Sequence, residues 1–226
     1  MITTYNFTCI EQLSEQIKHV DSVNLQLKKG KYYSKFSQII KNNHILHQVY
    51  SNISSSSEGE THEDFYMFLL IRSKDKQVFR NSSLNHTSII VMEPKTQYSK
   101  FSFGESTALI AYIPKQEIEE KFGSLSTGVY DVKNQKIIDE ILYLTFILFN
   151  SKQLNNHLIE CYSALIIEKI QASLVNIHSL CNNCKQCKKC IKFYEIVKFM
   201  KKEYKHNLEI TEIAEHFNIT DRTRSV

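Results

Sequence analysis

The sequence has 226 residues, among them no tryptophan, two prolines and five glycines. Phosphate-binding loops and dinucleotide fingerprints need several closely spaced glycines, so this scarcity argues against both, and no Gly-x-Ser-x-Gly motif occurs. His44 and His47 are three residues apart, so on an extended strand their side chains point to opposite faces and cannot bind one metal ion together. We therefore expect that the chain is not an enzyme.

Long hydrophobic runs are also missing. No stretch reaches the length of about eighteen apolar residues that a membrane-spanning helix needs, and residues 1–5 lack the basic start and apolar run of a secretory signal. With 42% hydrophobic and 23% charged residues, the composition favours a packed core. These features predict a cytoplasmic protein with no membrane partner.

Most of the chain before residue 114 reads as short strands separated by polar turns, after an amphipathic opening at residues 9–20. Short strands at this spacing predict an antiparallel barrel or sandwich, and such a barrel either encloses one small ligand or is filled by its own side chains. The polar segment Ser54–Glu60 is expected to be a mobile loop. The strands are predicted at residues 33–40, 44–50, 65–71, 76–80, 87–92, 97–103 and 107–113.

Two apolar helices are predicted after the strands. Residues 137–149 are apolar nearly all round but too few to span a bilayer, which indicates a buried helix. A second helical pattern follows residue 151, and its wide apolar face must be buried either on the chain's own β-domain or against a second copy. That face consists of Leu154, Leu158, Cys161, Tyr162, Leu165, Ile166, Ile170, Leu174 and Ile177.

Four cysteines fall within ten residues, each separated from the next by two residues. In a reducing compartment this grouping favours metal or redox chemistry over structural disulfides. The spacing differs from that of iron–sulfur loops and of zinc sites built from two distant Cys-x2-Cys pairs. A metal or iron–sulfur site, a reversible disulfide switch and a linker with incidental thiols therefore all stay open. The cluster consists of Cys181, Cys184, Cys187 and Cys190.

The last third of the chain carries the whole basic surplus. Residues 151–226 contain 12 basic and 8 acidic side chains, whereas residues 1–150 contain 16 of each. A basic amphipathic helix is predicted at residues 191–205 and a short helix at residues 211–217. Asn218 then suits a left-handed turn, and the hydroxyl of Thr220 can cap another helix. This order of elements is the outline of a helix-turn-helix.

The run from Ile191 to Thr223 resembles the first helix-turn-helix of AraC-type transcription regulators. Two earlier stretches, residues 27–39 and 111–118, are similar to parts of the barrel-type sensor domain that often precedes it. The positions that match the helix-turn-helix pattern are Leu208, Ile213, Ala214, Phe217, Ile219 and Thr220.

The resemblance implies an α+β protein that acts as a transcription activator, forms a homodimer and responds to a small molecule or to a redox or metal signal. It implies four segments: a β-rich, cupin-like sensor domain at 1–136, a helical dimerisation linker at 137–178, a Cys-rich linker at 179–190 and a partial helix-turn-helix at 191–226. The implied DNA contacts are Lys198, Lys201, Lys202, Thr220, Asp221, Arg222, Thr223, Arg224 and Ser225.

Two departures from the family pattern bear on DNA binding. The chain ends at Val226, where the family's recognition helix begins, and Arg224 stands where the family places an apolar anchor. We therefore expect a truncated regulator with weak DNA binding. The alternative is a thiol-sensing, metal-sensing or small-molecule-binding β-barrel protein without a DNA partner.

Overall fold

A computed structural model describes residues 1–17, 20–151, 153–175 and 177–179. The chain divides into two units, Met1–Cys181 and Asn182–Val226, and the described residues all belong to the first unit. The predicted helix-turn-helix and the cysteine cluster from Cys181 to Cys190 lie outside the described residues.

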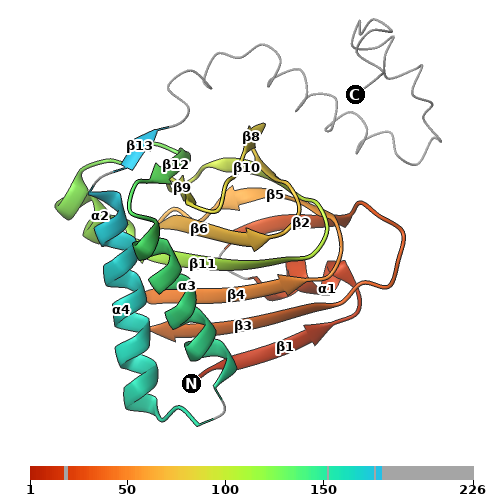
Figure 1. The fold of residues 1–226 in the computed structure, drawn as a ribbon, viewed down its shortest axis with the longest axis horizontal. Coiled ribbons are helices and arrows are strands. Elements are labelled where there is room, and N and C mark those ends of the chain that lie inside the picture. The colour runs from red at the N-terminus through yellow and green to blue at the C-terminus, as the bar shows by residue number, and fades with distance from the viewer. Residues whose placement is uncertain (18–19, 152, 176, 180–226) are drawn as a thin grey trace, which may run out of the picture. The chain divides into compact units, whose positions relative to one another are not determined.

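The described chain forms two antiparallel β-sheets, and the long helices lie on one side of the larger sheet (Figure 1). The larger sheet has the strand order β1 (Thr3–Phe7), β3 (Ser34–Lys41), β4 (His44–Ser51), β11 (Ser106–Pro114), β6 (Phe65–Ser73), β9 (Ser88–Met92), β12 (Gly128–Val132) and β13 (Ile177–Ser179). The smaller sheet has the order β2 (Val20–Gln26), β5 (Ser55–Thr61), β10 (Gln97–Ser102), β7 (Gln77–Phe79) and β8 (Ser82–Ser83).

The sequence prediction of a β-rich, antiparallel domain is confirmed, and the two sheets are open rather than closed into one barrel. All seven predicted strands are present, with ends shifted by one or two residues. The hairpin between β3 and β4 turns at Asn42 and Asn43, whose φ angles of 50° and 61° are those of a tight two-residue turn.

Four helices occur within the described residues. The first, α1 (Ile10–Gln16), lies at the smaller sheet, and α2 (Lys115–Phe122) follows β11 directly. The long helices α3 (Gln135–Asn150) and α4 (Asn156–Leu174) pack against each other and against the larger sheet (Figure 1). The side chain of Asn155 caps α4 by accepting a hydrogen bond from the Leu158 amide at 2.9 Å.

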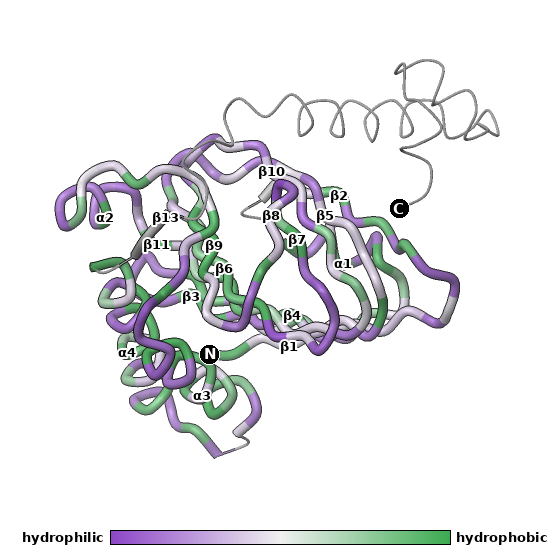
Figure 2. Tube along the Cα trace, turned by 45° about the horizontal axis from the view of Figure 1, so that its top comes forward, coloured by the Kyte–Doolittle hydropathy of each residue, from purple (hydrophilic) through white to green (hydrophobic). Residues whose placement is uncertain are grey.

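The larger sheet is buried on both faces, which explains why its central strands read as continuous apolar runs. On β6, Phe68 and Leu70 face the helices, whereas Met67 and Leu69 face the smaller sheet. Figure 2 shows that hydrophobic residues gather in β6, β9 and α3. This sheet therefore separates two hydrophobic cores that have only its strands in common.

Two sequence predictions are wrong. The serine-rich segment Ser54–Glu60 was expected to be a loop, but Ser55–Thr61 is strand β5, paired on both sides with β2 and β10. This strand contains three consecutive serines and none of the apolar residues that normally mark a strand in a sequence. Ile177 lies in β13 and pairs with Val132, so it does not continue the apolar face of α4.

The helix predicted at residues 137–149 lies within α3, but α3 is not buried all round. Ile141 and Leu148 are fully buried against the sheet, whereas Tyr143 is 65% exposed and Phe146 is 63% exposed. On α4, the row that includes Ile166 packs on the chain's own sheet. In the part of the chain that the structure describes, no helix is both long and apolar enough to cross a membrane.

Candidate ligand-binding pocket

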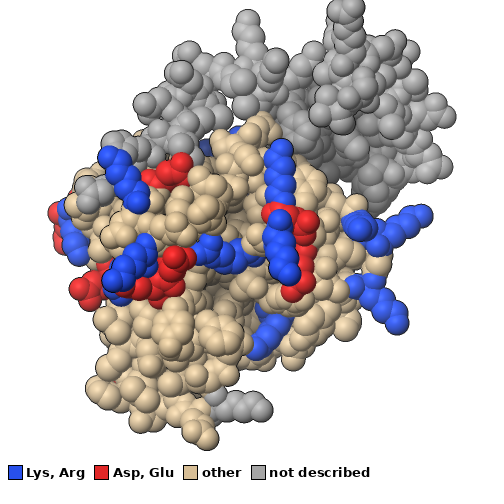
Figure 3. Space-filling view, viewed as in Figure 1, with Lys and Arg blue, Asp and Glu red and all other residues tan. Residues whose placement is uncertain are grey.

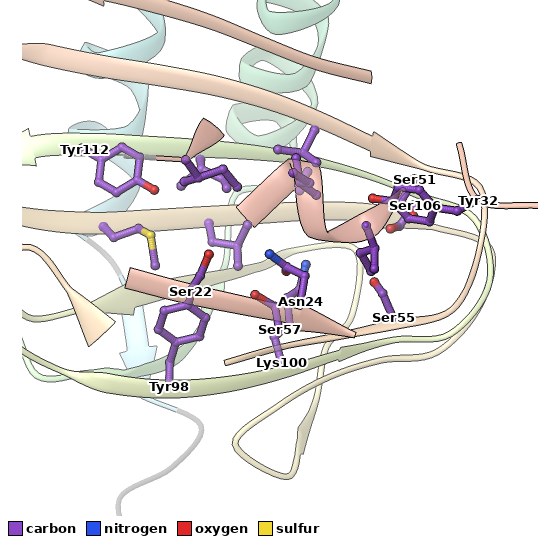
Figure 4. A pocket seen from close by; sticks show the side chains of 18 residues that line it. Ser22, Asn24, Tyr32, Ser51, Ser55, Ser57, Tyr98, Lys100, Ser106 and Tyr112 are labelled. Carbon is purple, nitrogen blue, oxygen red and sulfur yellow. The ribbon is translucent and has the colours of Figure 1, made fainter. Parts of the chain in front are cut away.

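A pocket lies between the two sheets, and α1 contributes to its wall (Figure 4). The smaller sheet supplies polar side chains from β2, β5 and β10, whereas the larger sheet supplies mostly apolar ones. The apolar wall consists of Val49, Met67, Leu69, Ala108 and Ile110, with Ile10, Leu13 and Ile17 from the α1 region.

The polar wall is arranged as rows across adjacent strands. Asn24, Ser57 and Lys100 lie directly opposite one another on β2, β5 and β10. Ser22 and Tyr98 form the next row, with Gly59 between them. In most two-sheet proteins the inward positions of both sheets are apolar. The inner face of this smaller sheet is instead lined by groups that can form hydrogen bonds.

Lys100 is the only charged side chain among the eighteen residues that line the pocket. Figure 4 shows it near Asn24 and Ser57 in the middle of the pocket. No acidic side chain of the described residues pairs with its ammonium group, and burial lowers the pKa of Lys100 to about 8. The ammonium group therefore stands in a site that disfavours its charge and in which the described residues supply no counter-ion.

Further polar groups line the same pocket. The Ser22 hydroxyl is buried and has no hydrogen-bond partner within the described chain. The Asn24 amide donates to the Ser14 hydroxyl at 2.8 Å, which ties α1 to β2 and leaves the Asn24 amide oxygen as an acceptor. Burial raises the pKa of the Tyr112 phenol, so this hydroxyl stays protonated at neutral pH.

The pocket is small. Its cavity volume is about 60 Å³. One water molecule needs a cavity volume of roughly 10–15 Å³, so the pocket has room for about four to six groups the size of a water molecule.

His47 lies beside this pocket rather than in it. Its ring is fully buried and packs edge-on between Phe36, at 4.8 Å between ring centroids, and Tyr112, at 5.1 Å. His44, three residues earlier, faces the helices and contacts Glu117 of α2 at 2.7 Å. The prediction that these two histidines point to opposite faces of the strand is confirmed.

A second hollow lies between α4 and the hairpin of β3 and β4. Several of its polar groups are paired. Lys41 pairs with Glu160 across the hollow. Gln171 donates to Glu117 of α2 and accepts from Lys121 of α2 at 2.7 Å. These contacts tether α4 to α2 and to the sheet. The hollow therefore has a structural explanation, which the uncompensated charge of Lys100 lacks.

The outer surface of α3 and α4 carries exposed apolar side chains. Besides Tyr143 and Phe146 of α3, Leu158 and Leu165 of α4 are about 40% exposed, and Cys161 is exposed between them. Figure 3 shows that the lower part of this face is almost free of charged side chains among the described residues. We call this set of five residues the helical patch.

The site residues predicted from the sequence lie elsewhere in the chain. Lys198, Lys201, Lys202 and the run Thr220–Ser225 lie outside the described residues, as do Cys181, Cys184, Cys187 and Cys190. Within the described residues, no group of three His, Cys, Asp or Glu side chains could hold a metal ion. Sequence reasoning did not identify Lys100, because the face of β10 that points inward is set by its pairing with β5 and β7.

No model of a protein family matches the sequence, and no curated protein is similar to it in sequence. Among solved structures, the AraC-like transcriptional activator CuxR is similar, with a TM-score of 0.55 and 11% sequence identity over 99% of this chain and 86% of CuxR. ToxT from Vibrio cholerae O395 has 13% identity over 91% of this chain and 72% of ToxT, but its TM-score of 0.31 is too low to support an argument. The chain therefore shares its fold with an AraC-like protein.

Proposed function

We propose that this chain is a cytoplasmic DNA-binding transcription regulator of the AraC type, in which the β-rich unit responds to a small molecule. The observation that carries the proposal is the similarity in fold to the AraC-like activator CuxR over nearly the whole chain. The helix-turn-helix pattern at residues 191–226 supports it independently, because that pattern was recognised from the sequence alone. The proposal assigns binding and no catalysis.

The effector site in this proposal is the pocket between the sheets. Its polar wall, and a lysine that no described acidic side chain pairs with, distinguish it from a core filled only by apolar side chains. A bound molecule would contact strands of both sheets, so its binding would stabilise one arrangement of the sheets over others.

The DNA-binding role rests on the basic C-terminal third of the sequence. We assign phosphate contacts to Lys198, Lys201 and Lys202 and base-edge contacts to the run from Thr220 to Ser225, because a helix-turn-helix places these positions at the duplex. Lysine contacts to phosphates release bound counterions, so binding that depends on them weakens steeply as salt rises.

The test is the salt dependence of binding of the full chain to a random 30-base-pair duplex, measured by fluorescence anisotropy. Each of the variants Lys201→Ala and Lys202→Ala should reduce the slope of log K against log salt by about 1. The control is Lys29→Ala, which removes an exposed lysine from the β-rich unit and should leave the slope unchanged. Duplex binding with no salt dependence, or an equal change in the control, would contradict the proposal.

The helical patch is assigned to a second copy of the chain. Leu158, Cys161 and Leu165 follow the spacing of three and four residues that characterises the contact line of paired helices. Because these side chains are exposed and apolar while the opposite face of α4 is buried on the sheet, pairing of two copies would cover them.

Sedimentation equilibrium of the full chain tests this assignment. Leu165→Glu should raise the dimer dissociation constant at least tenfold, because it places a charge in the contact line. Val23→Glu is the matched control, since Val23 is also apolar and exposed, at 55%, but lies on β2. A monomeric wild-type chain, or equal effects of the two variants, would refute dimerisation through the helical patch.

The second candidate function is thiol or metal sensing, and the spacing of the four cysteines from Cys181 to Cys190 favours it. Metal analysis and thiol titration of anaerobically purified protein are the direct tests. Four freely reacting thiols, no bound metal and unchanged DNA binding after replacement of all four by serine would remove this candidate.

A further inference from the structure

Lys100 offers the pocket a positive charge that no described group neutralises. Its neighbours across the strands, Asn24 and Ser57, are neutral. The other titratable groups that line the pocket are the phenols of Tyr98 on β10 itself, Tyr112 on β11, and Tyr32. A buried charge is costly unless it is paired. A bound anion would supply the missing partner.

The surroundings of Lys100 favour an anion of low charge. Lys100 is the one lysine or arginine that lines the pocket. A phosphate with two negative charges would therefore keep one buried charge without a positive partner. One carboxylate balances one ammonium group, and its second oxygen can accept a hydrogen bond from the Ser22 hydroxyl, which has no partner in the described chain.

The opposite wall is suited to a short hydrocarbon body. Val49, Met67 and Leu69 present apolar side chains from the larger sheet, facing the polar rows of the smaller sheet. The pocket has room for about four to six water-sized groups, which matches the heavy atoms of acetate to butyrate.

We propose that the pocket between the sheets binds a small monocarboxylate, with its carboxylate on Lys100 and its hydrocarbon body on Met67 and Leu69. This inference rests on the proposed function, because it names the class of molecule to which the regulator responds. It would make the regulator a sensor of short organic acids.

The test uses the full chain without DNA and follows the thermal unfolding midpoint of its β-structure by circular dichroism. Propionate is titrated against propionamide, which has the same shape but no charge, at constant ionic strength kept by sodium chloride. Propionate should raise the midpoint of the wild-type chain, because a ligand that binds only the folded state stabilises it. Propionamide should not.

Lys100→Met keeps most of the side-chain length and removes the charge, so the affinity for propionate should fall at least tenfold. Lys29→Met, at an exposed position, is the control and should bind propionate like the wild type. The affinity of the wild type should also fall as the pH rises above 8, towards that of Lys100→Met, because the neutral amine no longer attracts a carboxylate.

Three results would overturn the inference: equal stabilisation by propionate and propionamide, equal affinity of the wild type and Lys100→Met, or no stabilisation by any carboxylate from formate to butyrate. Because this experiment contains no DNA, its failure leaves the assignment as a regulator intact. Conversely, if the chain binds propionate through Lys100 but shows no salt-dependent DNA binding, the carboxylate site is supported and the assignment as a regulator is refuted.

Discussion

Replacement of Lys100 by methionine should stabilise the ligand-free protein at neutral pH. Burial lowers the pKa of Lys100 from 10.5 to about 8, and each unit of difference corresponds to about 1.4 kcal/mol between the two protonation states. The full difference would be about 3.5 kcal/mol. Because Lys100 is only partly buried and water screens its charge, we expect a gain of roughly 2 kcal/mol for Lys100→Met at pH 7.

The sign of the pH dependence follows from the lowered pKa. Below pH 8 both the folded and the unfolded chain hold the proton, so the cost of the buried charge is fully present. Between pH 8 and pH 10.5 the folded chain loses the proton first, so the unfolded chain holds more protons and the stability of the wild type rises with pH. The advantage of Lys100→Met should therefore be constant below pH 8 and shrink above it.

Urea unfolding of both chains at pH 6, 7, 8, 9 and 10, followed by circular dichroism of the β-structure, measures this difference. Comparison of two chains that differ only at residue 100 cancels the titration of the other groups, including the phenol of Tyr112. Lys100→Arg is the control, because arginine keeps its charge over this range and should show no gain at any pH. A difference that does not change with pH, or a Lys100→Met chain less stable than the wild type at pH 7, would refute the reasoning.

Phe68→Ala should lower the free energy of unfolding by about 3–5 kcal/mol in a urea titration, because the ring is fully buried between the larger sheet and the helices; a loss below 1 kcal/mol would contradict this packing. Asn155→Ala should cost about 1 kcal/mol in the same assay, because it removes the cap of α4, and an undetectable loss would rule out the cap. Gly104→Ala should destabilise more than Gly123→Ala, since both positions have a positive φ but only at Gly104 would the added methyl collide with Asp75; equal losses would disprove the collision.

The strands that the sequence predicted are those of the doubly buried sheet. Runs such as Phe65–Ile71 carry apolar side chains towards both cores, so their β-branched and aromatic residues mark them without ambiguity. Strand β5 escaped prediction because its inward serines, Ser55 and Ser57, face the pocket rather than a hydrophobic core. The same chemistry that makes the pocket polar removed the signal by which strands are recognised.

The inward position of Lys100 was not predicted from the sequence for a related reason. In the run from Gln97 to Ser102, the alternation rule would place Phe101 inside and its neighbour Lys100 outside. The structure has the opposite arrangement, because the pairing of β10 with β5 and β7 aligns Lys100 with Ser57 and with the buried Phe79. The register of distant strands decides this face, and the local sequence of one strand does not contain that information.

The position of the pocket connects it to the helical patch through a single layer of strands. On β11, Ala108, Ile110 and Tyr112 line the pocket, whereas the alternate residues Leu109 and Ala111 pack in the core beneath α3 and α4. A ligand that displaces the pocket-lining side chains of β11 must also move the backbone that carries its core side chains, because close-packed cores transmit such shifts rather than absorb them. We therefore predict that a ligand on Lys100 alters the proposed pairing of two copies without any contact with α3 or α4, and that the dimer dissociation constant differs with and without propionate.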